Sequence, residues 1–208
     1  MEKNVNLKGK CFSKANMGQR KKSDFYQTPY SMTRQFLSAR FSRGKINSMV
    51  LEPACGQGDI VQVLREWFSA VESYDLEDGT DFLTWGGTAP YVVTNPPFNL
   101  ANQFIEKCLQ AAKIGFGLLM PLNYLQGKAR YDQFFKSSAR KKIQLNLKTV
   151  YIFTRMPMLS ESIREDGKYP TGMQAYAWYW WEHTTATDPA IRWLDNSEYV
   201  LRKKDIQL

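Results

Sequence analysis

The sequence is poor in the residues that build metal sites and disulfide frameworks. Its three cysteines, Cys11, Cys55 and Cys108, lie far apart without a Cys-x-x-Cys pair, and His183 is the only histidine. An odd number of widely spaced cysteines without a histidine cluster argues against a structural metal ion and against a disulfide scaffold. We therefore expect no metal site, a reducing environment, and no catalytic role for His183.

Long apolar runs are also missing. The longest mainly apolar stretch covers residues 114–125, which is too short and too interrupted to span a bilayer. The N-terminus lacks the apolar core of a signal peptide. We therefore expect a soluble, cytoplasmic protein with no membrane partner.

Acidic residues are outnumbered by basic ones. The chain has 208 residues, 28 Lys and Arg against 20 Asp and Glu, and a formal net charge of +8. This balance favours a polyanionic partner, although it also serves solubility. Residues 1–24 are strongly basic and lack apolar periodicity, which predicts a flexible arm, either a nucleic-acid tether or a tail with no role. Residues 25–208 are expected to form a single domain.

Apolar periodicity alternates between helical and extended patterns along the chain. The patterns predict helices at residues 31–41, 60–68, 102–112 and 127–137, and strands at 49–51, 71–76, 91–94, 114–120, 149–153 and 175–182. Such alternation predicts an α/β fold with a largely parallel sheet covered on both faces. The aromatic run at residues 178–181 is expected to be a half-buried strand, and Phe153 is expected in the core.

A glycine loop at residues 51–58 lies between the first expected strand and the next helix, where open α/β sheets bind nucleotide-like ligands. The loop fails as a dinucleotide fingerprint because Val61 stands where the third glycine should be, so NAD is disfavoured. Asp75 follows the second strand and is well placed to accept hydrogen bonds from both ribose hydroxyls. A purely structural glycine turn is the alternative, and Glu52 in the same crevice argues against it.

The tetrapeptide Asn95-Pro96-Pro97-Phe98 directly follows the apolar run at residues 91–94. The Asn95 side-chain oxygen and the Pro96 carbonyl could each accept one hydrogen of a planar amine and so localise its lone pair. Phe98 could stack on the ring, and consecutive prolines make the loop stiff. The tetrapeptide therefore predicts a site for chemistry on a planar amine, with an ordinary strand-exit turn as the alternative.

Together these motifs resemble class I S-adenosylmethionine-dependent methyltransferases, and most closely the adenine amino-methyltransferases that act on DNA. The resemblance implies a Rossmann-like fold with a mostly parallel seven-stranded sheet and helices on both faces. It implies Asn95, Pro96, Pro97 and Phe98 as catalytic residues. It implies S-adenosylmethionine as cofactor, bound by Tyr26, Thr28, Pro29, Glu52, Pro53, Cys55, Gly56, Gly58, Asp75, Asp81, Phe82 and Asn95.

The family assigns distinct roles to these positions. The loop Glu52 to Gly58 would wrap the methionine part of the cofactor, and Asp75 would bind its ribose. Asp81 and Phe82 match a pair that holds the cofactor's adenine after the family's third strand. The segment 24–29, with its Thr-Pro step, resembles one that closes over the cofactor. The motif order resembles the gamma arrangement.

The implied reaction is methyl transfer to the exocyclic amine of adenine in DNA, as in restriction-modification systems, with the base flipped out of the stack. Basic residues at 136–148 favour nucleic acid. Too few residues follow Glu182 for a target-recognition domain, so specificity would come from a partner subunit or from the insertion at 159–172. The alternatives are methylation of RNA adenine or protein glutamine, and a catalytically silent cofactor-binding or DNA-binding subunit.

Overall fold

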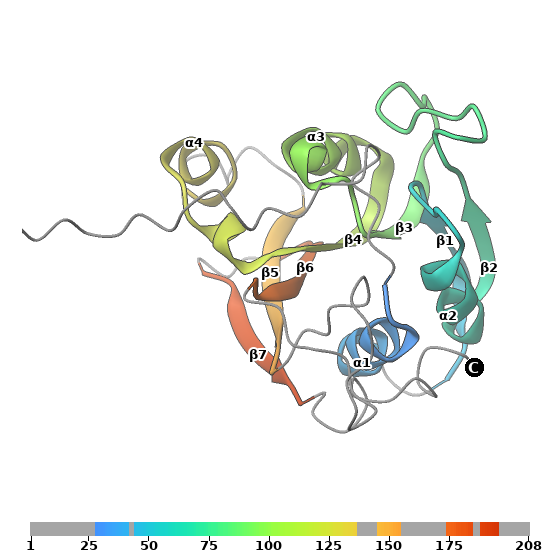
Figure 1. Ribbon diagram of the computed structural model, residues 1–208, viewed down its shortest axis with the longest axis horizontal. Coiled ribbons are helices and arrows are strands. Elements are labelled where there is room, and N and C mark those ends of the chain that lie inside the picture. Colours follow the sequence, from blue (N-terminus) through green and yellow to red (C-terminus); the bar gives the residue numbers. More distant parts are fainter. Residues whose placement is uncertain (1–27, 42–43, 137–144, 155–173, 185–187, 196–208) are drawn as a thin grey trace, which may run out of the picture.

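The computed structural model describes residues 28–41, 44–136, 145–154, 174–184 and 188–195. They form a sheet of seven strands in the order β2-β1-β3-β4-β6-β5-β7 (Figure 1). Adjacent strands are parallel except that β6 runs antiparallel to both β4 and β5. The expected mostly parallel seven-stranded sheet is therefore confirmed. The strands are β1 (Ile46–Glu52), β2 (Phe68–Ser73), β3 (Ala89–Thr94), β4 (Ala112–Pro121), β5 (Asn146–Phe153), β6 (Tyr176–Glu182) and β7 (Ala190–Leu194).

Helices cover both faces of the sheet (Figure 1). The helices are α1 (Tyr30–Arg40), α2 (Asp59–Trp67), α3 (Ala101–Ala111) and α4 (Lys128–Arg130). Apolar side chains of α1 and α2 pack into one core cluster, and those of α3 into another. Within the part of the chain described here, no helix is long and apolar enough to cross a membrane.

The helix expected at 127–137 is present but shorter and partly irregular, because the short α4 is followed by a π-helical turn over Tyr131–Phe135. Strand β7 was not predicted, because its residues have no clear alternation of buried and exposed positions. Only Leu194 of this edge strand is buried, and Trp193 is 68% exposed.

Strand β6 lies inside the sheet, and its aromatic side chains are buried on both faces. The expectation of a half-buried strand is wrong, since residues 178–181 are all fully buried. Trp178 stacks on Phe36 of α1 at 4.6 Å between ring centroids, and Trp181 stacks on Phe116 of β4 at 4.7 Å. Burial on both faces follows from the central position of β6 beneath helices on each side. Phe153 is buried in the core, as expected.

Strand β4 makes room for these rings with glycines. A Cβ atom added at Gly115 would lie 2.7 Å from the Trp180 ring and 2.8 Å from the Trp181 carbonyl oxygen. We expect Gly115→Ala to lower the free energy of unfolding by about 1–3 kcal/mol, because the surrounding groups must shift. Chemical denaturation measures the change. Gly86→Ala is the matched control, because no atom lies within 4 Å of the added Cβ there; equal stability of the two variants would contradict the prediction.

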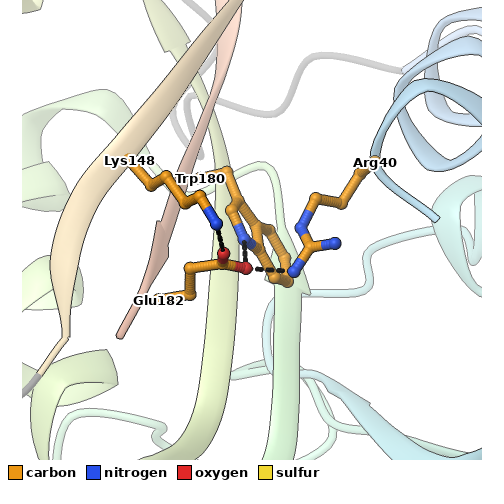
Figure 2. A network of polar contacts seen from close by, with 4 residues as sticks. All are labelled: Arg40, Lys148, Trp180 and Glu182. Carbon is orange, nitrogen blue, oxygen red and sulfur yellow. Dashed lines mark hydrogen bonds and ion pairs between the residues drawn. The ribbon is translucent and has the colours of Figure 1, made fainter. Parts of the chain in front are cut away.

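A charged cluster joins α1 to the sheet at the amino ends of β4 and β5. Glu182 accepts hydrogen bonds from Lys148 and Arg40, and from the Trp180 ring nitrogen at 2.6 Å (Figure 2). Burial would raise the pKa of Glu182, but these donors outweigh it and lower the pKa. Glu182 therefore remains ionised between its two cations and ties α1 to β5 and β6.

Several parts of the sequence interpretation lie outside the described residues. They are the basic arm at 1–24, Tyr26, the basic residues at 140–142 and the insertion at 159–172.

Candidate functional site

A cavity of about 590 Å³ opens at the carboxyl ends of β1, β2 and β3. This is the edge at which open α/β sheets bind their ligands. Its wall includes nine of the residues expected at the site: Thr28, Pro53, Cys55, Gly56, Asp75, Asp81, Phe82, Asn95 and Pro97. Further wall residues that the motifs did not indicate include Asp59, Leu76, Thr80, Asn99 and Phe104.

The glycine loop has the backbone conformation that its sequence predicts. Gly56 has φ 49° and Gly58 has φ 84°, in the left-handed region that favours glycine. Gly58 immediately precedes α2 and does not line the cavity, so its role is to turn the chain into the helix. Burial, followed by the Glu52 and Asp75 carboxylates, raises the pKa of Cys55, which therefore stays a protonated thiol.

Asp75 fastens this loop to the end of β2. Its Oδ2 accepts a hydrogen bond from the Gly56 backbone N–H at 2.8 Å, and its Oδ1 accepts one from the Glu77 N–H at 3.0 Å. A carboxylate offers about four lone-pair sites, so two backbone bonds leave acceptor capacity for ligand hydroxyls. Asp75 lies in the cavity wall in a fixed orientation.

Glu52 lies behind the cavity rather than in its wall, and it is fully buried. Its Oε1 accepts from the Thr94 hydroxyl at 2.5 Å and from the Ala54 N–H at 3.4 Å, so it links the glycine loop to the end of β3. Burial raises the pKa of Glu52 to about 8, and the two hydrogen bonds offset only part of this rise. Among the described residues, no hydrogen-bond partner reaches its buried Oε2.

The raised pKa of Glu52 predicts a pH dependence of stability. The folded protein holds this proton up to about pH 8, whereas the unfolded chain releases it near 4.5. The contribution of Glu52 to stability is therefore full below about pH 4.5 and declines as pH rises through 8. We expect Glu52→Gln to flatten the decline in the free energy of unfolding between pH 5 and 8. Denaturation at several pH values tests this against the exposed Glu72→Gln control, and parallel curves for both variants and wild type would refute it.

Asn95 is held at the cavity wall by a contact from far along the chain. Its amide nitrogen donates to the Thr28 hydroxyl oxygen at 3.1 Å, which fixes the orientation of the amide. Thr28 is buried just before α1, and the adjacent Pro29 is buried without lining the cavity. The contact joins the Thr-Pro segment to the tetrapeptide.

The other tetrapeptide residues occupy different positions. Pro97 lines the cavity, whereas Pro96 is buried and outside its wall. The Phe98 ring packs on Tyr176 of β6, with ring centroids 5.4 Å apart, and lines a second cavity.

Asp81 and Phe82 lie in turns, since the described residues 74–88 contain no strand. The pair therefore lies between β2 and β3, where the sequence also predicted no strand. Asp81 accepts from the Leu83 N–H at 2.9 Å, and the Phe82 ring packs on Phe104 of α3 at 5.4 Å between centroids. Phe82 is only 2% exposed, so it presents little of its ring to the cavity.

The charge of the cavity wall is opposite to that of the chain. Its described lining contains Asp59, Asp75, Glu77 and Asp81 and no Lys, Arg or His, in a protein of net charge +8. Carboxylates at one cavity wall favour a cationic ligand. No group of three or more His, Cys, Asp or Glu among the described residues is arranged to hold a metal ion.

The second cavity, of about 500 Å³, adjoins the first and shares Asn99 with it. Its wall combines Phe98 with residues from α3, α4, the end of β4 and the 3₁₀ turns Phe98–Leu100 and Leu122–Leu125: Asn99, Ala101, Asn102, Gln103, Pro121, Asn123, Tyr124 and Arg130. The tetrapeptide loop therefore separates two cavities.

Comparison with known proteins gives similarity of structure only. No protein-family model matches the chain, and no curated protein matches it. A putative class I S-adenosylmethionine-dependent methyltransferase from Listeria monocytogenes superposes over 83% of this chain and 70% of its own, with TM-score 0.52 and 12% identity. A modification subunit of a putative type I restriction enzyme from Vibrio vulnificus has TM-score 0.52 and 12% identity over 80% of this chain.

The chain has the class I methyltransferase fold. A putative RNA methyltransferase from Pyrococcus horikoshii has the same fold, with TM-score 0.51 and 14% identity over 78% of this chain and 88% of its own. The chain spans only 45% of the Vibrio subunit. In this methyltransferase fold, both cavities lie at the carboxyl end of the sheet.

Proposed function

We propose that the protein transfers a methyl group from S-adenosylmethionine to the exocyclic amine of adenine in DNA. The observation that carries the proposal is the position of Asn95 in the wall of an acidic cavity. Directly beside it lies a second cavity, whose described wall has Arg130 as its one charged residue. Methyl transfer requires a donor and an acceptor that meet at one point. The tetrapeptide loop lies between two cavities that could hold them.

The first cavity suits S-adenosylmethionine by charge and by its donor and acceptor groups. The cofactor carries a sulfonium and an ammonium group, which the four wall carboxylates favour. Asp75 offers acceptor capacity for ribose hydroxyls, and the glycine loop lets the backbone approach closely. Glu52 supports this loop from behind. When bound, S-adenosylmethionine would supply a methyl group that is already electrophilic.

The residues of this chain would act by positioning and by polarising the acceptor. An aromatic amine is a poor nucleophile because its lone pair is delocalised into the ring. The Asn95 amide oxygen and the Pro96 carbonyl oxygen would each accept a hydrogen bond from one N–H of the amine. These bonds would stabilise the positive charge that develops on the nitrogen. The hydrogen bond from Asn95 to Thr28 holds the amide in one orientation before substrate arrives.

DNA is proposed as the substrate because the chain is strongly basic outside an acidic cavity. A base must leave the stack to reach such a pocket. We further propose that residues 25–208 act as one catalytic domain whose sequence specificity is supplied by a partner subunit. RNA adenine is the second candidate, since a putative RNA methyltransferase shares the fold.

Transfer of labelled methyl from S-adenosylmethionine tests the proposal. Unmodified duplex DNA, single-stranded DNA, RNA and a protein extract are offered separately, and products are read as nucleosides or amino acids. Methylated adenine from DNA supports the proposal. Label on RNA adenine or protein glutamine would mean that the substrate is RNA or protein and not DNA. Cofactor binding without transfer to any acceptor would indicate a catalytically silent subunit.

A further inference from the structure

The second cavity contains an amide whose orientation is fixed by a buried tyrosine. The Tyr124 hydroxyl donates a hydrogen bond to Oδ1 of Asn102, an exposed residue on α3. Tyr124 is itself 8% exposed, and burial raises its pKa to about 12, so the hydroxyl keeps its proton. With its oxygen bound to Tyr124, Asn102 offers its amide nitrogen to a ligand, and that nitrogen is a donor.

The same tyrosine holds the one charged residue in the described wall of this cavity. The Arg130 guanidinium lies 4.7 Å from the centre of the Tyr124 ring and donates to the Tyr124 carbonyl at 2.8 Å and to the Gln126 carbonyl. An arginine has five N–H donors, so these bonds leave others available. Stacking and carbonyl contacts fix the cation in place, which lowers the entropy lost when it binds an anion.

These features specify a ligand. The Asn102 N–H donor can pair with a ring nitrogen that carries no hydrogen. The fixed Arg130 cation, in a described wall that contains no carboxylate, suits the phosphates of a nucleic-acid strand. Adenine presents a bare ring nitrogen on each side of its exocyclic amine, at N1 and at N7. A base that turns a ring N–H toward Asn102, as guanine does at N1, would leave both donors unpaired.

We propose that the second cavity receives the acceptor base and that Asn102, oriented by Tyr124, donates a hydrogen bond to the ring nitrogen beside the methylated amine. This rests on the proposed function and names specificity residues for it. Asn102 reads the base, Tyr124 positions Asn102, and Arg130 attracts the flanking phosphates. The tetrapeptide holds the amine itself from the other side.

Base analogues test the contact directly. Duplexes are made with adenine, 1-deazaadenine or 7-deazaadenine at every adenine position, each analogue replacing one ring nitrogen by C–H while keeping the amine. For wild-type protein, we expect one analogue to lower kcat/KM by about 10- to 100-fold, the effect of one lost hydrogen bond. In Asn102→Ala the penalty for that analogue should disappear, because the donor is already gone.

Tyr124→Phe keeps the ring beneath Arg130 and releases only the Asn102 amide, so it should reduce the same penalty partly. Gln110→Ala is the matched control, because Gln110 is exposed on α3 and outside both cavity walls; it should keep the full penalty. Equal penalties in wild type, Asn102→Ala and Gln110→Ala would overturn the proposal while methyl transfer itself continues. Absence of transfer to any adenine-containing duplex would instead overturn the proposed function, and this inference with it.

Discussion

Asn95→Ala is expected to lower the rate of methyl transfer at least about 100-fold, while the affinity for S-adenosylmethionine stays nearly unchanged. The loss follows from removing the acceptor that would stabilise the developing charge on the amine. Cofactor affinity should persist because the wall carboxylates and the glycine loop remain in place. Asn95 is part-buried, and its replacement also removes the hydrogen bond to the Thr28 hydroxyl.

The test separates binding from chemistry. Single-turnover rates at saturating cofactor report the transfer step, and calorimetry gives the cofactor Kd. Asn47→Ala is the matched control, because Asn47 is an exposed asparagine on β1 outside both cavity walls. Thr28→Val removes the hydrogen bond that orients the Asn95 amide and should lower the rate by a smaller factor, with Thr28→Ser restoring it. Transfer by Asn95→Ala at the wild-type rate would remove Asn95 from the proposed mechanism.

Most of the fold could be predicted from the sequence because the sheet is built from strongly patterned segments. In the apolar run at residues 114–120, residues 115–120 are buried although Ile114 is exposed, and a helix between strands such as α2 carries a clear apolar stripe. The pattern fails where burial is one-sided or absent, as in β7, whose residues are mainly exposed. It also does not distinguish helix types, since the second part of the helix expected at 127–137 is a π-helical turn.

The site was predictable to the extent that its residues follow strands. Parallel strands bring their carboxyl ends to one edge, so Glu52, Asp75 and Asn95 were expected to converge. Their different depths were not predictable, because burial depends on packing between distant segments. Glu52 is fully buried and supports the loop, whereas Asp75 lines the cavity.

Contacts between distant segments leave no local signal in the sequence. The bond from Asn95 to Thr28 spans 67 positions, and the bond from Tyr124 to Asn102 spans 22. Neither residue pair shares a periodic pattern, so the second cavity and its fixed amide became visible only in three dimensions. Asn123 and Tyr124 both lie in the wall of this second cavity.

Asp75→Asn is expected to weaken S-adenosylmethionine binding by about 10- to 100-fold, because the variant loses a negative charge and acceptor capacity at the ribose position. Asp78→Asn is the matched control, since Asp78 is exposed three residues away and outside the cavity wall. Calorimetry gives the Kd of each variant.

The carboxylate also fastens Gly56, so a weaker Kd has two physical explanations that must be separated. If Asp75 acts on the ligand, saturating cofactor should restore the transfer rate of Asp75→Asn, and its thermal unfolding should match that of Asp78→Asn. If it acts only by holding the loop, the unfolding temperature should fall together with the affinity. Unchanged affinity would mean that neither the charge of Asp75 nor its bond to the loop contributes to cofactor binding. Any electrostatic attraction of the cofactor by the cavity wall would then have to come from Asp59, Glu77 and Asp81.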